Sequence, residues 1–170
     1  MTNNFVFETD LAAKTIHIIR EFNAPVEKVW KAWTEPALLE KWVVLKHWTA
    51  ETRMMDFTVG GVWLYAMISP EGQKHWVYAQ FTAIENGSAI STTGMFCDTD
   101  GNPVPDGPKS YRDTVFSSID GNRTKIDMVI TFEEESTLRK FVEGGFKEGI
   151  AMTLDLLDEL LARENQDLNG

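Results

Sequence analysis

Residues 136–161 read STLRKFVEGGFKEGIAMTLDLLDELL, and this stretch decides the fold. Its apolar residues recur at the spacing of one helix face, while charged residues occupy the other side. The shared apolar stripe comprises Leu138, Val142, Phe146, Ile150, Thr153, Leu157, Leu160 and Leu161. A helix of roughly 25 residues is about 37 Å long, which is enough to cross a whole domain. The pattern therefore predicts one long amphipathic helix that buries a single face.

The start and the glycines of this helix are less regular than its apolar stripe. Ser136 or Thr137 is expected to cap the start, because a hydroxyl there accepts a bond from a free backbone N–H. Gly144, Gly145 and Gly149 interrupt the pattern, and each glycine costs about 1 kcal/mol in a helix interior. Together they indicate a kink, a late helix start, or the close approach of another backbone.

Upstream of this helix the sequence alternates short strands with turns. The predicted strands are 51–58, 61–68, 74–84, 89–97, 111–119 and 124–132. Asn86-Gly87 is the strongest of the turn signals between them. Consecutive strands joined by short turns form an antiparallel sheet, and one face of that sheet must be covered. The long helix is the only predicted element large enough to cover it.

The beginning of the chain adds one strand and two short helices. Residues 14–22 are rich in isoleucine and predict a first strand. Helical spacing follows Pro25 in the residues Val26, Val29, Trp30 and Trp33. Thr34 is expected to cap a second short helix that ends near Trp42. The fold class is thus α+β, with a curved antiparallel sheet wrapped around a long C-terminal helix and a cavity between them.

Several short motifs also resemble a known superfamily. Residues 18–36 read IIREFNAPVEKVWKAWTEP and are similar to the opening of the SRPBCC (START-like, Bet v 1-like) superfamily. Further matches are residues 41–42, 60–63, Met67, 70–72 and 145–146. The closer resemblance is to the bacterial branch homologous to the activator of the heat-shock chaperone ATPase. It implies a single helix-grip domain over residues 1–170 with a deep pocket. Members carry lipids, hormones or polyketides, and some are cyclases or hydrolases, so fold alone does not give function.

Aromatic and methionine residues along the predicted strands and the last helix are the candidates for lining this pocket. Rigid rings beside adaptable methionines suit a flat or flexible apolar ligand, although each residue singly also suits an ordinary core. The candidate ligand-binding residues are Trp63, Tyr65, Met67, Trp76, Tyr78, Phe81, Phe96, Met128, Phe146 and Ile150. We therefore expect the chain to bind a small hydrophobic molecule, lipid-like or aromatic.

Two alternatives stay open at this point. One is a cyclase- or hydrolase-type enzyme that uses an acid in the same cavity, for which Asp113 and Asp127 are the candidates. A carboxyl group buried there would have a raised pKa and could donate a proton, but strand alternation puts Asp127 on the face expected to be solvated. No catalytic residue is assigned. The other alternative, implied by the resemblance, is a chaperone partner whose ATPase is stimulated, although a single domain offers no second unit to bridge a large partner.

Composition narrows the partners further. The formal net charge of −10 repels phosphate backbones and argues against nucleic acid. The three histidines lie far apart in the sequence and Cys97 is the only cysteine, so neither a metal site nor a cofactor is expected. The start has no basic leader, and no apolar run approaches the roughly 20 residues of a membrane span. We expect a cytoplasmic protein without membrane insertion, and a homodimer is compatible with the sequence.

Overall fold

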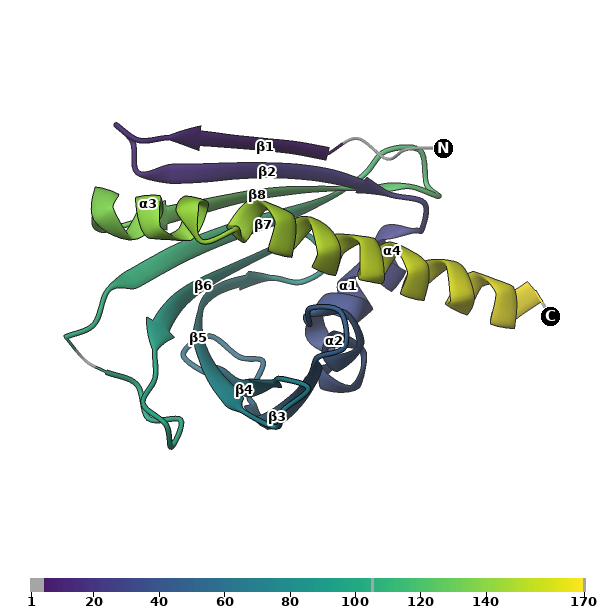
Figure 1. The fold of residues 1–170 in the computed structure, drawn as a ribbon. Helices are drawn as coiled ribbons and strands as arrows, with labels where there is room; N and C mark the ends of the chain where they lie inside the picture. The colour runs from purple at the N-terminus through teal and green to yellow at the C-terminus, as the bar shows by residue number, and fades with distance from the viewer. Residues whose placement is uncertain (1–4, 105, 170) are drawn as a thin grey trace.

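The structure, a computed structural model, describes residues 5–104 and 106–169, with side chains as far as residue 163. One antiparallel sheet of eight strands runs in the order β1-β2-β8-β7-β6-β5-β4-β3 (Figure 1). The strands are β1 (Phe5–Asp10), β2 (Thr15–Phe22), β3 (Thr49–Met55), β4 (Val62–Ile68), β5 (Lys74–Glu85), β6 (Ala89–Phe96), β7 (Lys109–Ser118) and β8 (Thr124–Phe132). The helices are α1 (Val26–Thr34), α2 (Pro36–Trp42), α3 (Glu135–Glu143) and α4 (Phe146–Asn169).

The curved sheet grips α4, which confirms the predicted α+β helix-grip fold. Figure 1 shows α4 crossing in front of the sheet, with α1 and α2 beside its middle part. β2 pairs with β8, so strands far apart in the sequence are neighbours in the sheet, with Ile18 opposite Met128. All six strands predicted between residues 51 and 132 are present as β3 to β8.

Strand β1 is absent from the prediction. It forms an edge strand that pairs with β2 from Phe5 opposite Arg20 to Asp10 opposite Thr15. Its apolar residues are only partly buried and its second half is exposed, so its hydrophobic pattern is weak. An edge strand of this kind is fixed by backbone pairing with its neighbour more than by burial of its own side chains.

The C-terminal stripe forms two helices, the short α3 and the long C-terminal helix α4 that the sequence predicts, which begins at Phe146. Gly145, between α3 and α4, has a φ of +89°, a left-handed conformation that glycine adopts without steric cost. The late helix start is therefore the correct alternative. The break also turns Val142, a predicted stripe residue, outward to solvent.

The expected helix caps are wrong. α3 is preceded by Glu134, which makes no side-chain cap bond, so neither Ser136 nor Thr137 caps it. α2 is preceded by Glu35, and the Thr34 hydroxyl instead donates to the carbonyl of Trp30 at 3.0 Å. In both places the helix begins without the side-chain hydrogen bond that the sequence favours.

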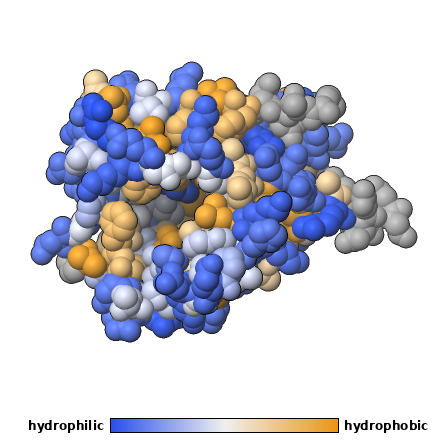
Figure 2. All heavy atoms as spheres, viewed as in Figure 1, coloured by the Kyte–Doolittle hydropathy of each residue, from blue (hydrophilic) through white to orange (hydrophobic). Residues whose placement is uncertain are grey.

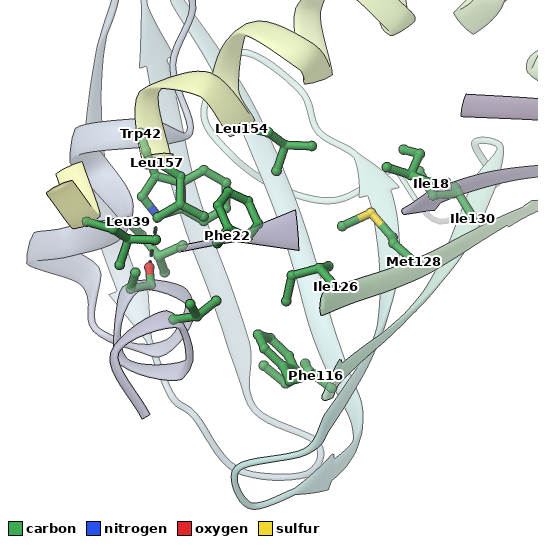
Figure 3. Packing of buried hydrophobic residues seen from close by; sticks show 14 of the residues in the cluster. Ile18, Phe22, Leu39, Trp42, Phe116, Ile126, Met128, Ile130, Leu154 and Leu157 are labelled. Atoms are coloured by element: carbon green, nitrogen blue, oxygen red, sulfur yellow. Dashed lines mark hydrogen bonds between the residues drawn. The ribbon is translucent and has the colours of Figure 1, made fainter. Parts of the chain in front are cut away.

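The hydrophobic core lies between α4 and the face of the sheet that it covers, which we call the inner face. β2 and β8 contribute alternate residues to it, and α1 and α2 close one side. Figure 3 shows Leu157 of α4 beside Leu39 and Trp42 of α2. The Trp42 indole N–H donates to the backbone carbonyl of Ala32 at 2.9 Å, which joins α2 to α1. This packing fixes the position of α4 over the sheet.

Candidate ligand-binding cavity

A cavity of about 500 Å³ lies between the inner face and the first half of α4. This volume is within the roughly 300–1,000 Å³ of typical small-molecule sites. Its walls come from strands β4 to β8 and from all four helices. Figure 2 shows a hollow in this face of the molecule, with hydrophobic residues at its edge.

All ten residues predicted to bind a ligand border this one cavity. They come from four strands and α4, and they lie up to 87 positions apart in the chain, from 63 to 150. In chain order they are Trp63, Tyr65, Met67, Trp76, Tyr78, Phe81, Phe96, Met128, Phe146 and Ile150. The fold thus brings the whole predicted set together, and contact with a ligand remains a prediction for each of them.

Strand register separates two of these ten residues from the others. Pairing between β4 and β5 places Trp76 and Tyr78 on the sheet face opposite Tyr65. The Arg53 guanidinium carbon lies 4.2 Å from the centre of the Trp76 ring, and the Trp76 indole N–H donates to the carbonyl of Thr99 at 3.1 Å. These contacts hold the ring on the outer face. Trp76 and Tyr78 therefore border the cavity, although their side chains lie on the outer face of the sheet.

Aromatic side chains of β4 form a rigid part of the cavity wall. The rings of Trp63 and Tyr65 are stacked, with centroids 3.9 Å apart and planes at 19°. The Trp63 indole N–H donates to the Thr52 hydroxyl at 3.2 Å, which fixes the Trp63 ring of this stack. A preformed apolar surface of this kind binds flat or chain-like molecules without first having to be ordered.

Tyr65 adds a polar group to this apolar wall. Burial raises the pKa of its phenol to about 12, and the positive charge of Arg112 acts in the opposite direction. Since this value is far above neutral pH, the phenol keeps its proton. Tyr65 therefore presents a hydroxyl that can donate a hydrogen bond inside the cavity.

Arg112 is the cavity residue that sequence reasoning missed. It lies on β7 between Thr92 of β6 and Ile130 of β8, on the inner face. Burial lowers the pKa of its guanidinium, while the part of its surface that stays accessible faces the cavity. Strand alternation could have found it, because the residue next to a solvated Asp113 must point inward.

The two candidate acids lie on the outer face. Asp113 accepts a hydrogen bond from the Ser91 hydroxyl at 2.6 Å, and Asp127 is 2.7 Å from Nε2 of His17. The outward position of Asp127 confirms the expectation from strand alternation. The residues that line the cavity, all within the described part of the chain, include no aspartate or glutamate.

Two other kinds of site have no counterpart in residues 5–104 and 106–169. No three histidine, cysteine, aspartate or glutamate side chains gather there closely enough to hold a metal ion. No helix of these ranges is long and apolar enough to cross a membrane.

The sequence matches one family profile over most of its length. The family is described as Activator of Hsp90 ATPase homolog 1-like protein, and the match covers residues 23–162. This match confirms the resemblance that the opening motif predicts. Comparison with curated proteins gives no match.

Solved structures from several bacteria are similar to this chain throughout. A protein from Arthrobacter aurescens is 32% identical with a TM-score of 0.86, and the match covers 93% of this chain and 91% of that one. Protein Ms6760 from Mycobacterium smegmatis is 30% identical with a TM-score of 0.84, over 93% and 97% of the two chains. A protein from Staphylococcus epidermidis is 24% identical with a TM-score of 0.82, over 94% of each, and shows the fold alone.

Proposed function

The chain belongs to the Activator of Hsp90 ATPase homolog 1-like family, and from this premise we propose that it binds a small apolar molecule in the cavity beneath α4. The observation that carries the proposal is the cavity itself. Protein interiors are close-packed and contain few voids larger than a water molecule. A pocket of about 500 Å³ that opens to solvent yet is lined mostly by apolar side chains is therefore best explained by a guest that covers this apolar surface.

The lining supports an apolar guest of modest size. Most of the wall is aromatic or aliphatic, with Trp63 and Met67 on one side and Phe146 and Ile150 on the other. Burying apolar surface contributes about 25 cal/mol per Å², so a molecule enclosed by these side chains gains affinity from its whole surface. We infer that the guest is aromatic or lipid-like.

The other functions weighed from the sequence receive less support. Acid catalysis needs a carboxyl group in the cavity, and Asp113 and Asp127 are both on the outer face. Stimulation of a chaperone ATPase would use an outer surface, whereas the distinctive feature of this chain is an interior space. Ligand binding is the function that uses this space.

The test is binding of N-phenyl-1-naphthylamine, a neutral apolar dye whose fluorescence rises when water is excluded. We expect the dye to bind and to raise the free energy of unfolding, by about 2.7 kcal/mol at a concentration of 100 times its dissociation constant. Replacing Ile150 by tryptophan fills the cavity and should abolish this binding. Glu148→Trp adds the same side chain at an exposed position of α4 and should leave binding intact.

Two results would contradict the proposal. The first is a wild-type protein that gains no stability from the dye. The second is equal binding by the Ile150→Trp and Glu148→Trp variants, which would place the dye outside the cavity.

A further inference from the structure

Arg112 carries the only charge on the inner face of the cavity strands that has no acidic partner in the described part of the chain. The lining residues include the two cations Lys109 and Arg112 and no carboxylate. The register of β7 turns Arg112 toward the inner face and Lys109 toward the outer one. In a chain with a net charge of −10, a cavity whose one inward-facing charged lining residue is an arginine is not a consequence of overall composition.

A second arginine on the same inner face shows how this fold compensates a buried cation. Arg20 of β2 is almost fully buried, and its guanidinium lies 2.9 Å from the Asp155 carboxylate and 3.6 Å from that of Asp158, both on α4. A buried charge is tolerated when a carboxylate and hydrogen bonds accompany it. Arg112 is partly buried, and the α4 residues that line the same cavity are Phe146, Gly149, Ile150, Thr153 and Leu154, none of which is a carboxylate.

Tyr65 does not compensate the charge of Arg112. Its phenol keeps its proton at neutral pH, so it is neutral and can donate a hydrogen bond toward the cavity. The cavity therefore holds two donors, a guanidinium and a hydroxyl, that influence each other electrostatically. Both are complementary to a single negatively charged acceptor, and a guanidinium binds a planar carboxylate through two parallel hydrogen bonds.

We propose that the guest of this cavity carries one acidic group, which binds to the Arg112 guanidinium and the Tyr65 hydroxyl while its apolar body lies along Trp63, Met67 and Ile150. This inference rests on the proposed function, because it names the class of molecule that occupies the same cavity. The ligand is thus an amphipathic organic acid, aromatic or aliphatic. The missing counter-ion of Arg112 is supplied by the guest instead of by the protein.

A matched pair of dyes tests the acidic group separately from the apolar body. 1-Anilinonaphthalene-8-sulfonate has the skeleton of N-phenyl-1-naphthylamine with one added sulfonate. Replacing Arg112 by methionine keeps the apolar stem and removes the charge. We expect the dissociation constant of the anionic dye to rise by roughly 10- to 100-fold, the range for a lost hydrogen bond to a charged group. That of the neutral dye should change less than about twofold.

Two further variants keep the result interpretable. Arg53→Met removes an arginine from the outer face, where it packs on Trp76, and should leave the affinity for both dyes unchanged. Arg112→Lys keeps a cation without the planar fork and should retain part of the preference for the anionic dye. Arg112→Met should fold at least as stably as the wild type without ligand, since it removes an uncompensated buried charge.

The outcomes separate the two proposals. If neither dye binds the wild type, the cavity is not a binding site and both proposals fail. If the neutral dye binds and Arg112→Met weakens both dyes equally, or neither, the acidic group is not recognised and only the present inference is overturned. An equal loss in Arg53→Met would also overturn it, because the effect would then reflect the charge of the whole molecule.

Discussion

The inner face of the sheet has a packed region and a hollow region, and the same helix covers both. In the packed region, Ile18 and Ile126 of the sheet and Leu157 of α4 are almost completely inaccessible to solvent. In the hollow region, the first half of α4 faces Tyr65 and Arg112 across the cavity. Each region contains an arginine, and only the one in the packed region has carboxylates from the protein as partners. One scaffold thus combines a close-packed region with a region that contains the proposed binding cavity.

Side-chain size explains why one region is hollow. Where β2 and β8 present isoleucine and phenylalanine to α4, strands β5 to β7 present small residues to the cavity. These are Ala79, Thr92, Gly94, Ser110 and Thr114. On α4, the cavity lining includes Gly149, which has no side chain. The cavity therefore corresponds to side-chain volume that is missing from these strands.

The largest contrast between the regions is expected for truncation of a core side chain. Leu157→Ala removes a fully buried side chain from the packed region and should lower the free energy of unfolding by about 2–5 kcal/mol. Met67→Ala, at the cavity wall, should cost less than about half of this, because its side chain already borders empty space. Chemical denaturation of both variants measures the difference, and equal losses would mean that the hollow region is as tightly packed as the other.

Much of the fold follows from periodicity in the sequence. The stripe that contains Leu138, Leu157 and Leu161 predicts the helix, and alternation in residues 124–132 predicts β8 with its observed bounds. The break at Gly145 and the edge strand β1 depend on backbone conformation and pairing, which the hydrophobic pattern does not report. Hydrophobic periodicity therefore predicts which faces of the helices and strands are buried. It does not predict the helix break at Gly145 or the edge strand β1.

The residues of the candidate site are likewise predicted only in part by the sequence. Aromatic and methionine residues mark the cavity strands, so the ten predicted residues do border it. Trp76 and Tyr78 belong to the predicted set because they are aromatic, although the pairing of β4 with β5 puts them on the outer face. Arg112 was missed because a charged residue on a strand is usually solvated, and only the three-dimensional arrangement shows it facing a cavity without a carboxylate.

A pH-dependent contrast of intermediate size is expected from Tyr65. Its folded-state pKa, about 12, lies above the ordinary value of 10.0, so the folded protein binds this proton more tightly than the unfolded chain. The resulting stability is fully present below pH 10 and is lost as the pH rises toward 12, at about 1.4 kcal/mol per pH unit. Between pH 9.5 and 11, Tyr65→Phe should therefore gain about 1 kcal/mol relative to the wild type.

Denaturation at a series of alkaline pH values measures this gain. The Arg112→Met variant provides a second check, because Arg112 lowers the folded-state pKa of Tyr65 and its loss should extend the decline to higher pH while the start near pH 10 stays unchanged. A stability difference between Tyr65→Phe and wild type that stays constant from pH 9 to 11 would show that the phenol is not buried in the hollow region.

A further contrast is expected for two glycines that lie four residues apart. Gly145→Ala forces a Cβ into a left-handed conformation and should cost about 1–2 kcal/mol. Gly149 is helical, and a Cβ there would meet only Leu45 Cδ2 within 4 Å, at the ordinary contact distance of 3.7 Å. Gly149→Ala should therefore stabilise the fold by up to about 1 kcal/mol.

The same Gly149→Ala substitution reduces the cavity, so it should weaken binding of N-phenyl-1-naphthylamine while it raises the free energy of unfolding. Opposite signs for stability and binding at one position are what a cavity kept open for a guest requires, since natural sequences tend to lose stability where function needs space. If Gly149→Ala instead lowered stability, α4 would be packed as closely over the hollow region as over Leu157, and the division of the inner face would not hold.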